Sequence, residues 1–215
     1  MPSGSCCSAP RSSCAVVAER VVAFAGSLRR KSYNRALIAA ARQLAPTELM
    51  TIETIEIGDL PFYNADVEQA GDPASVAAFK DAVGAADGLL IATPEYNDGI
   101  PGVLTNAVDW GSRFPGRSPL AGKPVALMGA SPSQVGTARA QLHLRQILGH
   151  AQARVLPPPE LLLARAHERF DSELRLTDDS TRRVLTSLLE RFSRWIVRER
   201  NALETERQLA SNSRV

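Results

Sequence analysis

Apolar residues along this chain fall first into short runs that predict strands. Largely apolar runs at residues 21–25, 88–93 and 123–130 are typical of strands buried on both faces of a parallel sheet. Residues 50–57 alternate strictly between apolar and polar positions, so we expect a strand with one wetter face at the sheet edge. A short strand at residues 153–156, directly before three prolines, brings the expected number to five.

Apolar residues at helical spacing occupy the segments between these strands. The spacing predicts helices after residue 34, from the Asp72-Pro73 cap onward, over about residues 103–110 and up to His150. Strands that alternate with helices favour a doubly wound parallel sheet, because parallel neighbours need right-handed crossovers. We therefore expect an α/β fold with strand order 2-1-3-4-5 and helices on both faces. The loops after strands 1, 3 and 4 should then gather at the carboxyl edge of the sheet.

The two ends of the chain depart from this pattern. Residues 1–18 are rich in Ser and show no apolar period, so we expect a disordered tail before one folded domain over residues 19–200. A long terminal helix is predicted, and residues 201–215 are expected to be frayed or disordered because its apolar stripe fades near Asn201. The stripe consists of Val184, Leu185, Leu188, Leu189, Phe192, Trp195 and Ile196.

Length and composition limit the class of protein. The 215 residues fit one α/β domain, and 22% charged with 44% hydrophobic residues is ordinary for a globular protein. A net charge of +2 favours neither non-specific nucleic-acid binding nor the acidic docking surface of an electron carrier. No apolar run approaches the length of a membrane-spanning helix. Cys6, Cys7 and Cys14 lie in an N-terminal segment without the long apolar middle of a secretory signal, so we expect a cytoplasmic protein.

The loop after the first strand carries the first candidate chemistry. Residues 26–34 combine a glycine, hydroxyl and amide side chains and three cations at a predicted helix start, where unpaired N–H groups and the helix dipole favour a phosphate. A dinucleotide-binding loop needs glycines where Leu28 and Lys31 stand, and a nucleoside-triphosphate loop needs one in place of Arg30. The pattern favours a monophosphate held by side-chain hydroxyls. A solvated basic turn is the alternative for this loop taken alone.

Three segments together resemble the NADPH-dependent FMN reductase family, which has a flavodoxin-like fold and includes chromate and quinone reductases. The resemblance covers roughly residues 20–195 in order. It rests on Gly26-Ser27-Leu28-Arg29 with Ser32 and Asn34, on Pro94-Glu95-Tyr96-Asn97 continuing to Ile100-Pro101-Gly102 and Asn106-Ala107-Val108-Asp109-Trp110, and on Arg139-Ala140-Gln141 before Leu144-Arg145-Gln146.

The resemblance implies an FMN site built from three loops. A flat, partly apolar flavin ring suits an apolar and aromatic wall with amide groups at its polar edge. Taken alone, Tyr96 would be expected to pack on its own domain and Glu95 to be a solvated charge. The third loop departs from the family, with Ser133 and Thr137 where relatives usually have more glycine. The implied residues are Ser27, Arg29, Ser32 and Asn34 for the FMN phosphate, Pro94, Glu95, Tyr96 and Asn97 for the ring, and Ser131 and Gly136 in the third loop.

Other polar residues add little to this site. Arg113 and Arg117 could meet the 2′-phosphate of NADPH, because Arg suits bidentate phosphate contacts, although loop arginines are more often solvated. The three histidines have no metal-ligand spacing with cysteines or carboxylates, so no metal site is predicted. Hydride passes directly from nicotinamide to flavin, and no residue is therefore assigned a catalytic role.

The resemblance implies an enzyme in which FMN passes electrons from NADPH or NADH to quinones, free flavin, chromate or a related acceptor. The alternative is a non-catalytic FMN-binding electron carrier or scaffold protein with the same fold. We also expect a homodimer or homotetramer, because the helix over residues 103–110 carries more apolar residues than one exposed face should, unless it is a core helix. By the same resemblance, Arg139 and Glu160 are expected to form a charged pair at a second interface.

Overall fold

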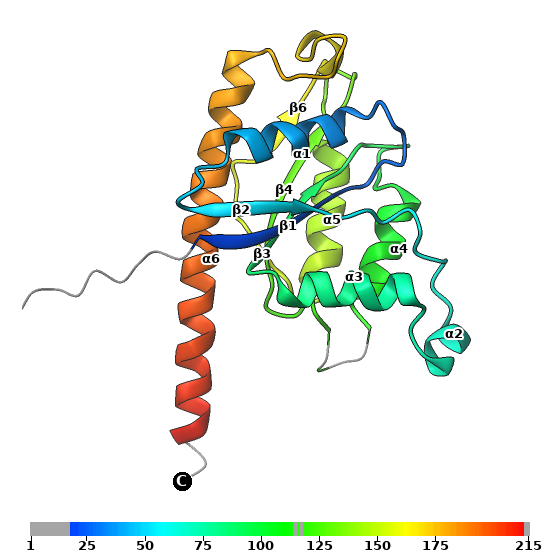
Figure 1. The fold of residues 1–215 in the computed structure, drawn as a ribbon, viewed down its shortest axis with the longest axis vertical. Coiled ribbons are helices and arrows are strands. Elements are labelled where there is room, and N and C mark those ends of the chain that lie inside the picture. The colour runs from blue at the N-terminus through cyan, green and yellow to red at the C-terminus, as the bar shows by residue number, and fades with distance from the viewer. Residues whose placement is uncertain (1–17, 114–115, 117, 213–215) are drawn as a thin grey trace, which may run out of the picture.

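A parallel sheet forms the centre of the computed structural model, which describes residues 18–113, 116 and 118–212. Its main path has the predicted order β2-β1-β3-β4-β5, and a further strand, β6, pairs with β4 (Figure 1). Residues 1–17, which make up nearly all of the expected N-terminal tail and include all three cysteines, lie outside the described residues. The strands are β1 (Glu19–Ala25), β2 (Met50–Thr54), β3 (Gly88–Ala92), β4 (Pro124–Ala130), β5 (Arg154–Val155) and β6 (Leu161–Leu163).

Helices cover both faces of this sheet, as expected for a doubly wound fold. On one face, α1 (Tyr33–Leu44) and α6 (Asp179–Asn212) pack with Val21, Leu90 and Met128 in one apolar cluster. The neighbouring strand residues Val22 and Leu89 point to the opposite face, because successive side chains of a strand alternate. There they meet α3 (Ala74–Ala85), α4 (Gly102–Gly111) and α5 (Ala138–His150).

The far edge of the sheet is split into two short strands where the sequence predicts one. β5 pairs with the first residues of β4, and β6 pairs with its last three. Prolines 157–159 stand between them and have no N–H to donate, so they interrupt the ladder. Arginines satisfy carbonyls of this interrupted segment: Arg145 donates to the carbonyl of Leu156 at 2.8 Å, and Arg191 donates to those of Pro157 and Pro159 at 2.7 and 3.0 Å.

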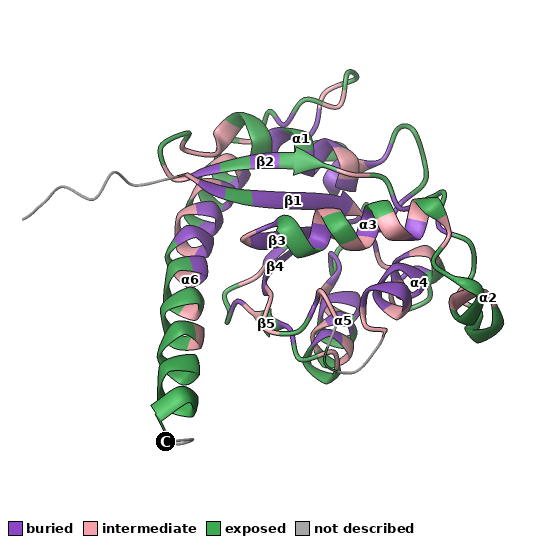
Figure 2. Ribbon diagram, turned by 60° about the horizontal axis from the view of Figure 1, so that its bottom comes forward, coloured by how far each residue is buried: buried purple, intermediate pink, exposed green. Residues whose placement is uncertain are grey.

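The terminal helix is longer than predicted. We expected a frayed or disordered segment from Asn201, but α6 continues as a helix to Asn212. Figure 2 shows that its last turns are exposed, and among residues 201–212 only Leu203 is partly shielded. The segment is rich in Ala, Leu, Glu, Arg and Gln, which have high helix propensity. Helix formation here therefore needs no apolar stripe, the signal that we used to set the boundary.

A short helix, α2 (Ala65–Ala70), was not predicted from the sequence. It buries no residue, and Asn64 caps it by accepting a hydrogen bond from the N–H of Asp66 at 2.9 Å. Without a buried face it leaves no periodic signal.

Across the described residues, no helix has the length and apolarity needed to cross a membrane.

The apolar residues of α4 belong to the core of the single chain. Leu104, Ala107, Val108 and Trp110 are at most 4% exposed, and the indole N–H of Trp110 donates to the carbonyl of Pro61 at 2.8 Å. The surplus apolar face that led us to expect an oligomer is therefore internal packing, and the core-helix alternative was right. The oligomeric state itself stays a prediction without this support.

Candidate functional site

The loop from β1 to α1 presents free backbone donors at a helix start. The hydroxyl of Ser32 caps α1 by accepting hydrogen bonds from the N–H groups of Asn34 and Arg35 at 3.2 and 3.4 Å. By contrast, the backbone N–H groups of residues 27–31 donate to no other described residue. Ser27 and Ser32 are buried, while Arg29 is exposed, with its guanidinium carbon 5.6 Å from the ring centroid of Tyr33. Unpaired donors, a hydroxyl and an exposed cation at the positive end of a helix are the groups that a phosphate needs.

Asn34 has a different role from the one that the resemblance implied. Its side chain is 2% exposed and forms two hydrogen bonds with the backbone of Ala130 at the end of β4, each 2.9 Å long. One runs from the amide nitrogen of Asn34 to the carbonyl of Ala130, and the other from the N–H of Ala130 to the amide oxygen of Asn34. Asn34 thus takes the place of a neighbouring strand beyond the last β3–β4 pair. It joins the first loop to the third, and the phosphate contact stays a prediction for Ser27, Arg29 and Ser32.

The loop after β3 makes a tight turn that holds an aromatic ring outward. Tyr96 and Gly99 exchange two backbone hydrogen bonds of 3.0 Å, and the residues between them, Asn97 and Asp98, have φ angles of 50° and 61°. Two successive positive φ values are typical of a type I′ turn. Tyr96 is 52% exposed, so it does not pack on its own domain as the alternative suggested, whereas Pro94 is buried. The turn offers an apolar base and an outward aromatic face.

Glu95 is neither a solvated charge nor free to face a ligand. Its side chain is 9% exposed and accepts a hydrogen bond of 2.9 Å from the N–H of Ala140, in the first turn of α5. Thr137, which precedes α5, makes no capping hydrogen bond with its own side chain. A carboxylate from another loop therefore satisfies the start of this helix, where negative charge is favoured by the helix dipole.

Arg139 and Glu160, the expected pair at an interface, each have partners within the chain. Arg139 lies 2.5 Å from Asp98 and 4.0 Å from Glu95. Glu160 lies 3.1 Å from Arg145. The charged pair predicted between subunits is thus not needed to neutralise either residue.

The third loop, after β4, is fixed by side-chain hydroxyls and by two glycines. The hydroxyl of Ser131 accepts a hydrogen bond from the N–H of Ser133 at 3.2 Å. A Cβ on Gly129 would lie 2.1 Å from the hydroxyl of Thr137, and Gly136 has a φ of 72° with a carbonyl only 3.1 Å from its would-be Cβ. The serine-rich sequence of this loop therefore keeps glycine at the two positions that need it. Gly129 was not singled out from the sequence, because a glycine inside an apolar strand gives no separate signal.

Direct contacts hold the three loops together at the carboxyl edge of the sheet. Gly26 donates to the carbonyl of Ala92 at 2.8 Å, and a Cβ on Gly26 would lie 3.1 Å from Leu104 and 3.4 Å from Pro94. The Asn34–Ala130 and Glu95–Ala140 bonds complete the connections. A flavin mononucleotide fits this arrangement, since free N–H donors for its phosphate and an apolar, aromatic turn for its ring lie on neighbouring loops.

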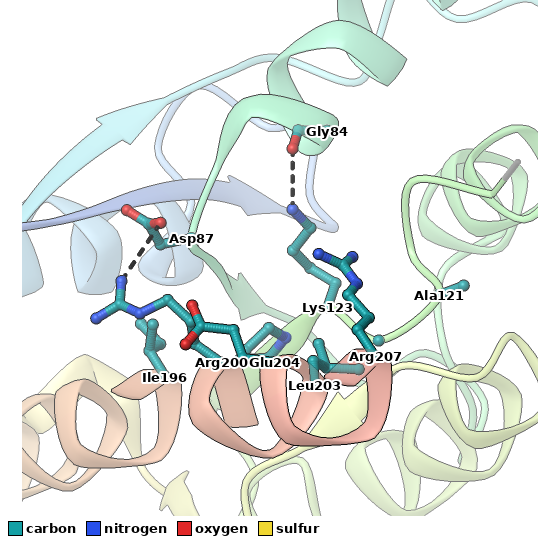
Figure 3. Close-up of a pocket in the computed structure, with 11 residues that line it drawn as sticks. Gly84, Asp87, Ala121, Lys123, Ile196, Arg200, Leu203, Glu204 and Arg207 are labelled. Atoms are coloured by element: carbon teal, nitrogen blue, oxygen red, sulfur yellow. Dashed lines mark hydrogen bonds and ion pairs between the residues drawn. The ribbon is translucent and has the colours of Figure 1, made fainter. Parts of the chain in front are cut away.

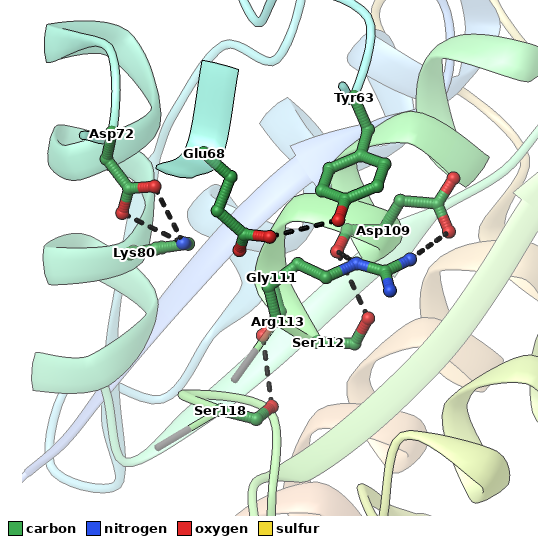
Figure 4. A network of polar contacts seen from close by, with 9 residues as sticks. All are labelled: Tyr63, Glu68, Asp72, Lys80, Asp109, Gly111, Ser112, Arg113 and Ser118. Carbon is green, nitrogen blue, oxygen red and sulfur yellow. Dashed lines mark hydrogen bonds and ion pairs between the residues drawn. The ribbon is translucent and has the colours of Figure 1, made fainter. Parts of the chain in front are cut away.

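The candidate contact for the NADPH 2′-phosphate is already engaged. Arg113 stacks on Tyr63, with its guanidinium carbon 4.2 Å from the ring centroid, and lies 3.7 Å from the carboxylate of Asp109 (Figure 4). The hydroxyl of Tyr63 donates to Glu68 at 2.9 Å, and this hydrogen bond raises the pKa of Tyr63. Arg117 lies outside the described residues. Within the described chain, no three His, Cys, Asp or Glu side chains come together as a metal site.

Comparison with known proteins identifies a family and several relatives of this chain. The family described as NADPH-dependent FMN reductase matches residues 20–168. An NAD(P)H-dependent FMN reductase of Pseudomonas aeruginosa is 44% identical over 181 residues, which cover 84% of this chain and 97% of the relative. A 2-hydroxy-1,4-benzoquinone reductase of a Burkholderia species is 39% identical over 84% of this chain and 97% of its own length.

A solved structure shows the same fold. FerB, a flavoenzyme NAD(P)H:(acceptor) oxidoreductase from Paracoccus denitrificans, superposes with a TM-score of 0.76 at 35% identity and covers 84% of this chain and 98% of its own. The predicted flavodoxin-like α/β fold is confirmed, and so is the prediction of an oxidoreductase that uses FMN and NAD(P)H. Because the family model matches most of the chain and the relative of Pseudomonas aeruginosa is covered over nearly its full length, the chain belongs to the NADPH-dependent FMN reductase family.

Proposed function

We propose that this protein binds FMN across the three loops and reduces quinones at the expense of NAD(P)H. The observation that carries the proposal is the run of unpaired N–H groups over residues 27–31, beside two buried serines at the start of α1. When bound, FMN supplies the redox chemistry by accepting hydride from the nicotinamide and passing electrons to the acceptor.

The residues of the chain would position the cofactor. Ser27, Ser32 and Arg29 would hold the phosphate, and the turn that begins at Pro94 would form the wall beside the ring. Asn34 and Glu95 would act indirectly, by fixing the third loop and the start of α5. Tyr96, half exposed beside the ring, would contact the acceptor. The structure assigns no proton transfer to any of these side chains.

A quinone acceptor is supported by the relatives. The Burkholderia protein is named a 2-hydroxy-1,4-benzoquinone reductase, and a protein of Escherichia coli K12 with 40% identity over 83% of this chain is named a quinone reductase. Chromate and free flavin belong to the proposal as further acceptors to be assayed beside a quinone. A cytoplasmic location and assembly as a homodimer or homotetramer are also proposals, and both rest on the sequence and the resemblance.

The test measures FMN binding and NADPH oxidation separately. Arg29→Ala should weaken FMN binding about tenfold to hundredfold, because a charge-assisted phosphate contact contributes roughly 1.5–3 kcal/mol. Saturating FMN should restore most of the rate of NADPH oxidation with a quinone. Arg42→Ala removes an exposed cation from the other end of α1 and should leave both quantities unchanged. A wild-type protein that binds no FMN, or that binds FMN without oxidising NADPH, would contradict the proposal.

A further inference from the structure

A cavity lies at the amino edge of the sheet, opposite to the three loops. Its volume is about 470 Å³, which is within the range of small-molecule sites. The segments before β3 and β4 form one wall, and α6 forms the other as it passes the end of the sheet (Figure 3). The exposed extension of α6 therefore encloses a space that the shorter helix predicted from the sequence would have left open.

In one part of this cavity, the positive charge of Arg200 is neutralised by nearby carboxylates. Arg200 donates to both carboxylate oxygens of Glu19 at 2.9 Å, and it lies 3.9 Å from Asp87. The hydrogen bond with Glu19 raises the pKa of Arg200, and the nearby charges of Asp87 and Glu204 act in the same direction. Three carboxylates thus surround one guanidinium, so this part of the cavity has no positive charge left for a ligand.

The other part contains two cations that form no ion pair with a described carboxylate. Lys123 donates to the carbonyls of Gly84 and Ala86 at 3.1 and 2.5 Å, which uses two of its three ammonium hydrogens. Its side chain is partly buried, and this burial lowers the pKa of Lys123, while the nearby charge of Asp87 acts in the opposite direction. The Arg207 side chain forms no hydrogen bond or ion pair with any described residue, and it lines the same cavity as Lys123 (Figure 3). Two like charges on the facing walls of the cavity repel each other, and an anion bound between them removes this repulsion.

The walls between these cations and the sheet are apolar. Ile196 and Leu203 of α6 line the cavity, and Leu203 packs 3.4 Å from the position of a Cβ on Gly122. A ligand held here would meet cations at one end and aliphatic side chains at the other. Inorganic anions would use only the first of these features.

We propose that this cavity binds a small organic phosphate, with the phosphate between Lys123 and Arg207 and the apolar part of the ligand against Leu203 and Ile196. Arg207 has all five N–H donors available and can contact two phosphate oxygens at once, and Lys123 contributes its third ammonium hydrogen. The site is separate from the flavin site, because it lies at the opposite edge of the same sheet.

The experiment uses the protein saturated with FMN, so that the phosphate groups of the flavin site are already occupied. AMP and inorganic phosphate are titrated separately by isothermal calorimetry. We expect one saturable site per chain, with tighter binding of AMP. Arg207→Met should weaken the binding of both probes at least about tenfold. Arg194→Met removes an exposed cation of α6 that does not line the cavity, and it should leave the affinity unchanged.

Two further outcomes make the test decisive. Lys123→Met also removes a cap from α3, so the variant that decides is Arg207→Met, whose side chain forms no hydrogen bond or ion pair with a described residue. Its FMN content and rate of NADPH oxidation should equal those of the wild type. AMP bound at the nicotinamide site would bind Arg207→Met as tightly as the wild type, and that result would overturn the proposal. Absence of saturable binding at millimolar probe, or AMP binding no tighter than phosphate, would do the same.

Discussion

Replacing Asn34 should cost more stability than replacing any exposed asparagine, because its side chain completes the backbone pairing of β4. Asn34→Ala removes two buried hydrogen bonds of 2.9 Å and leaves the N–H and carbonyl of Ala130 without partners. Each of these two orphaned buried groups costs about 1–3 kcal/mol, so we expect a loss of about 2–6 kcal/mol in the free energy of unfolding. That is a large part of the roughly 5–15 kcal/mol that holds a typical domain folded.

Urea unfolding of the FMN-free protein, followed by circular dichroism, measures this loss without a contribution from ligand binding. Asn34→Asp is nearly isosteric, but it places a carboxylate against the carbonyl of Ala130, so it should destabilise at least as strongly. Asn201→Ala, on the exposed part of α6, is the control and should change stability by less than about 0.5 kcal/mol. If Asn34→Ala unfolded at the same urea concentration as this control, the claim that Asn34 stabilises β4 by pairing with the backbone of Ala130 would be refuted.

Three further predictions use the same unfolding assay. Glu95→Ala should cost about 1–2 kcal/mol of stability, because it leaves the start of α5 uncapped. Glu95→Gln keeps an oxygen acceptor and should cost less than about 1 kcal/mol. Equal losses for the two variants would contradict the capping role. Gly129→Ala should cost about 3 kcal/mol or prevent folding, since its Cβ would lie 2.1 Å from a side-chain oxygen, while the open site at Gly149 should tolerate Ala or gain up to about 1 kcal/mol. Asp178 caps α6 through hydrogen bonds from the hydroxyl and N–H of Thr181, which lower the pKa of Asp178. The stability that Asp178 contributes should be fully present above the unfolded pKa of about 4 and should disappear as the pH falls through the lower pKa of the folded state. Asp178→Ala should therefore cost about 1 kcal/mol at neutral pH and progressively less in acid.

The sheet was predictable because β1, β3 and β4 are largely buried on both faces and appear as apolar runs, while β2, with one exposed face, appears as a strict alternation. The strand order followed from alternation with helices and is confirmed. β6 was missed because three leucines are too few to show a period, and the prolines before them suggested an end instead of an interruption. The last turns of α6 were missed for the opposite reason, since propensity forms that part of the helix and no apolar stripe marks it.

The candidate site was predictable as a set of loops but not as a set of contacts. The resemblance brought Ser27, Arg29, Pro94 and Tyr96 to one edge of the sheet. In the structure Arg29 and Tyr96 are exposed, Ser27 and Pro94 are buried, and the N–H groups of residues 27–31 are unpaired among the described residues. Side chains that hold one loop to another look the same in sequence as side chains that hold a ligand. An amide that pairs with the backbone of a strand 96 residues away gives no local signal, and Asn34 was assigned to the phosphate for that reason.

The split far edge of the sheet also limits how copies of this chain can associate. An unprotected edge strand can pair with the edge of another molecule and lead to aggregation. β5 has two residues, β6 has three, and the carbonyls of the prolines between them already accept hydrogen bonds from Arg191. At the other edge, β2 is only five residues long and exposes Thr51 and Glu53. The split β5–β6 edge therefore offers no continuous template for a foreign strand, and β2 is the edge at which pairing between the sheets of two chains would have to occur.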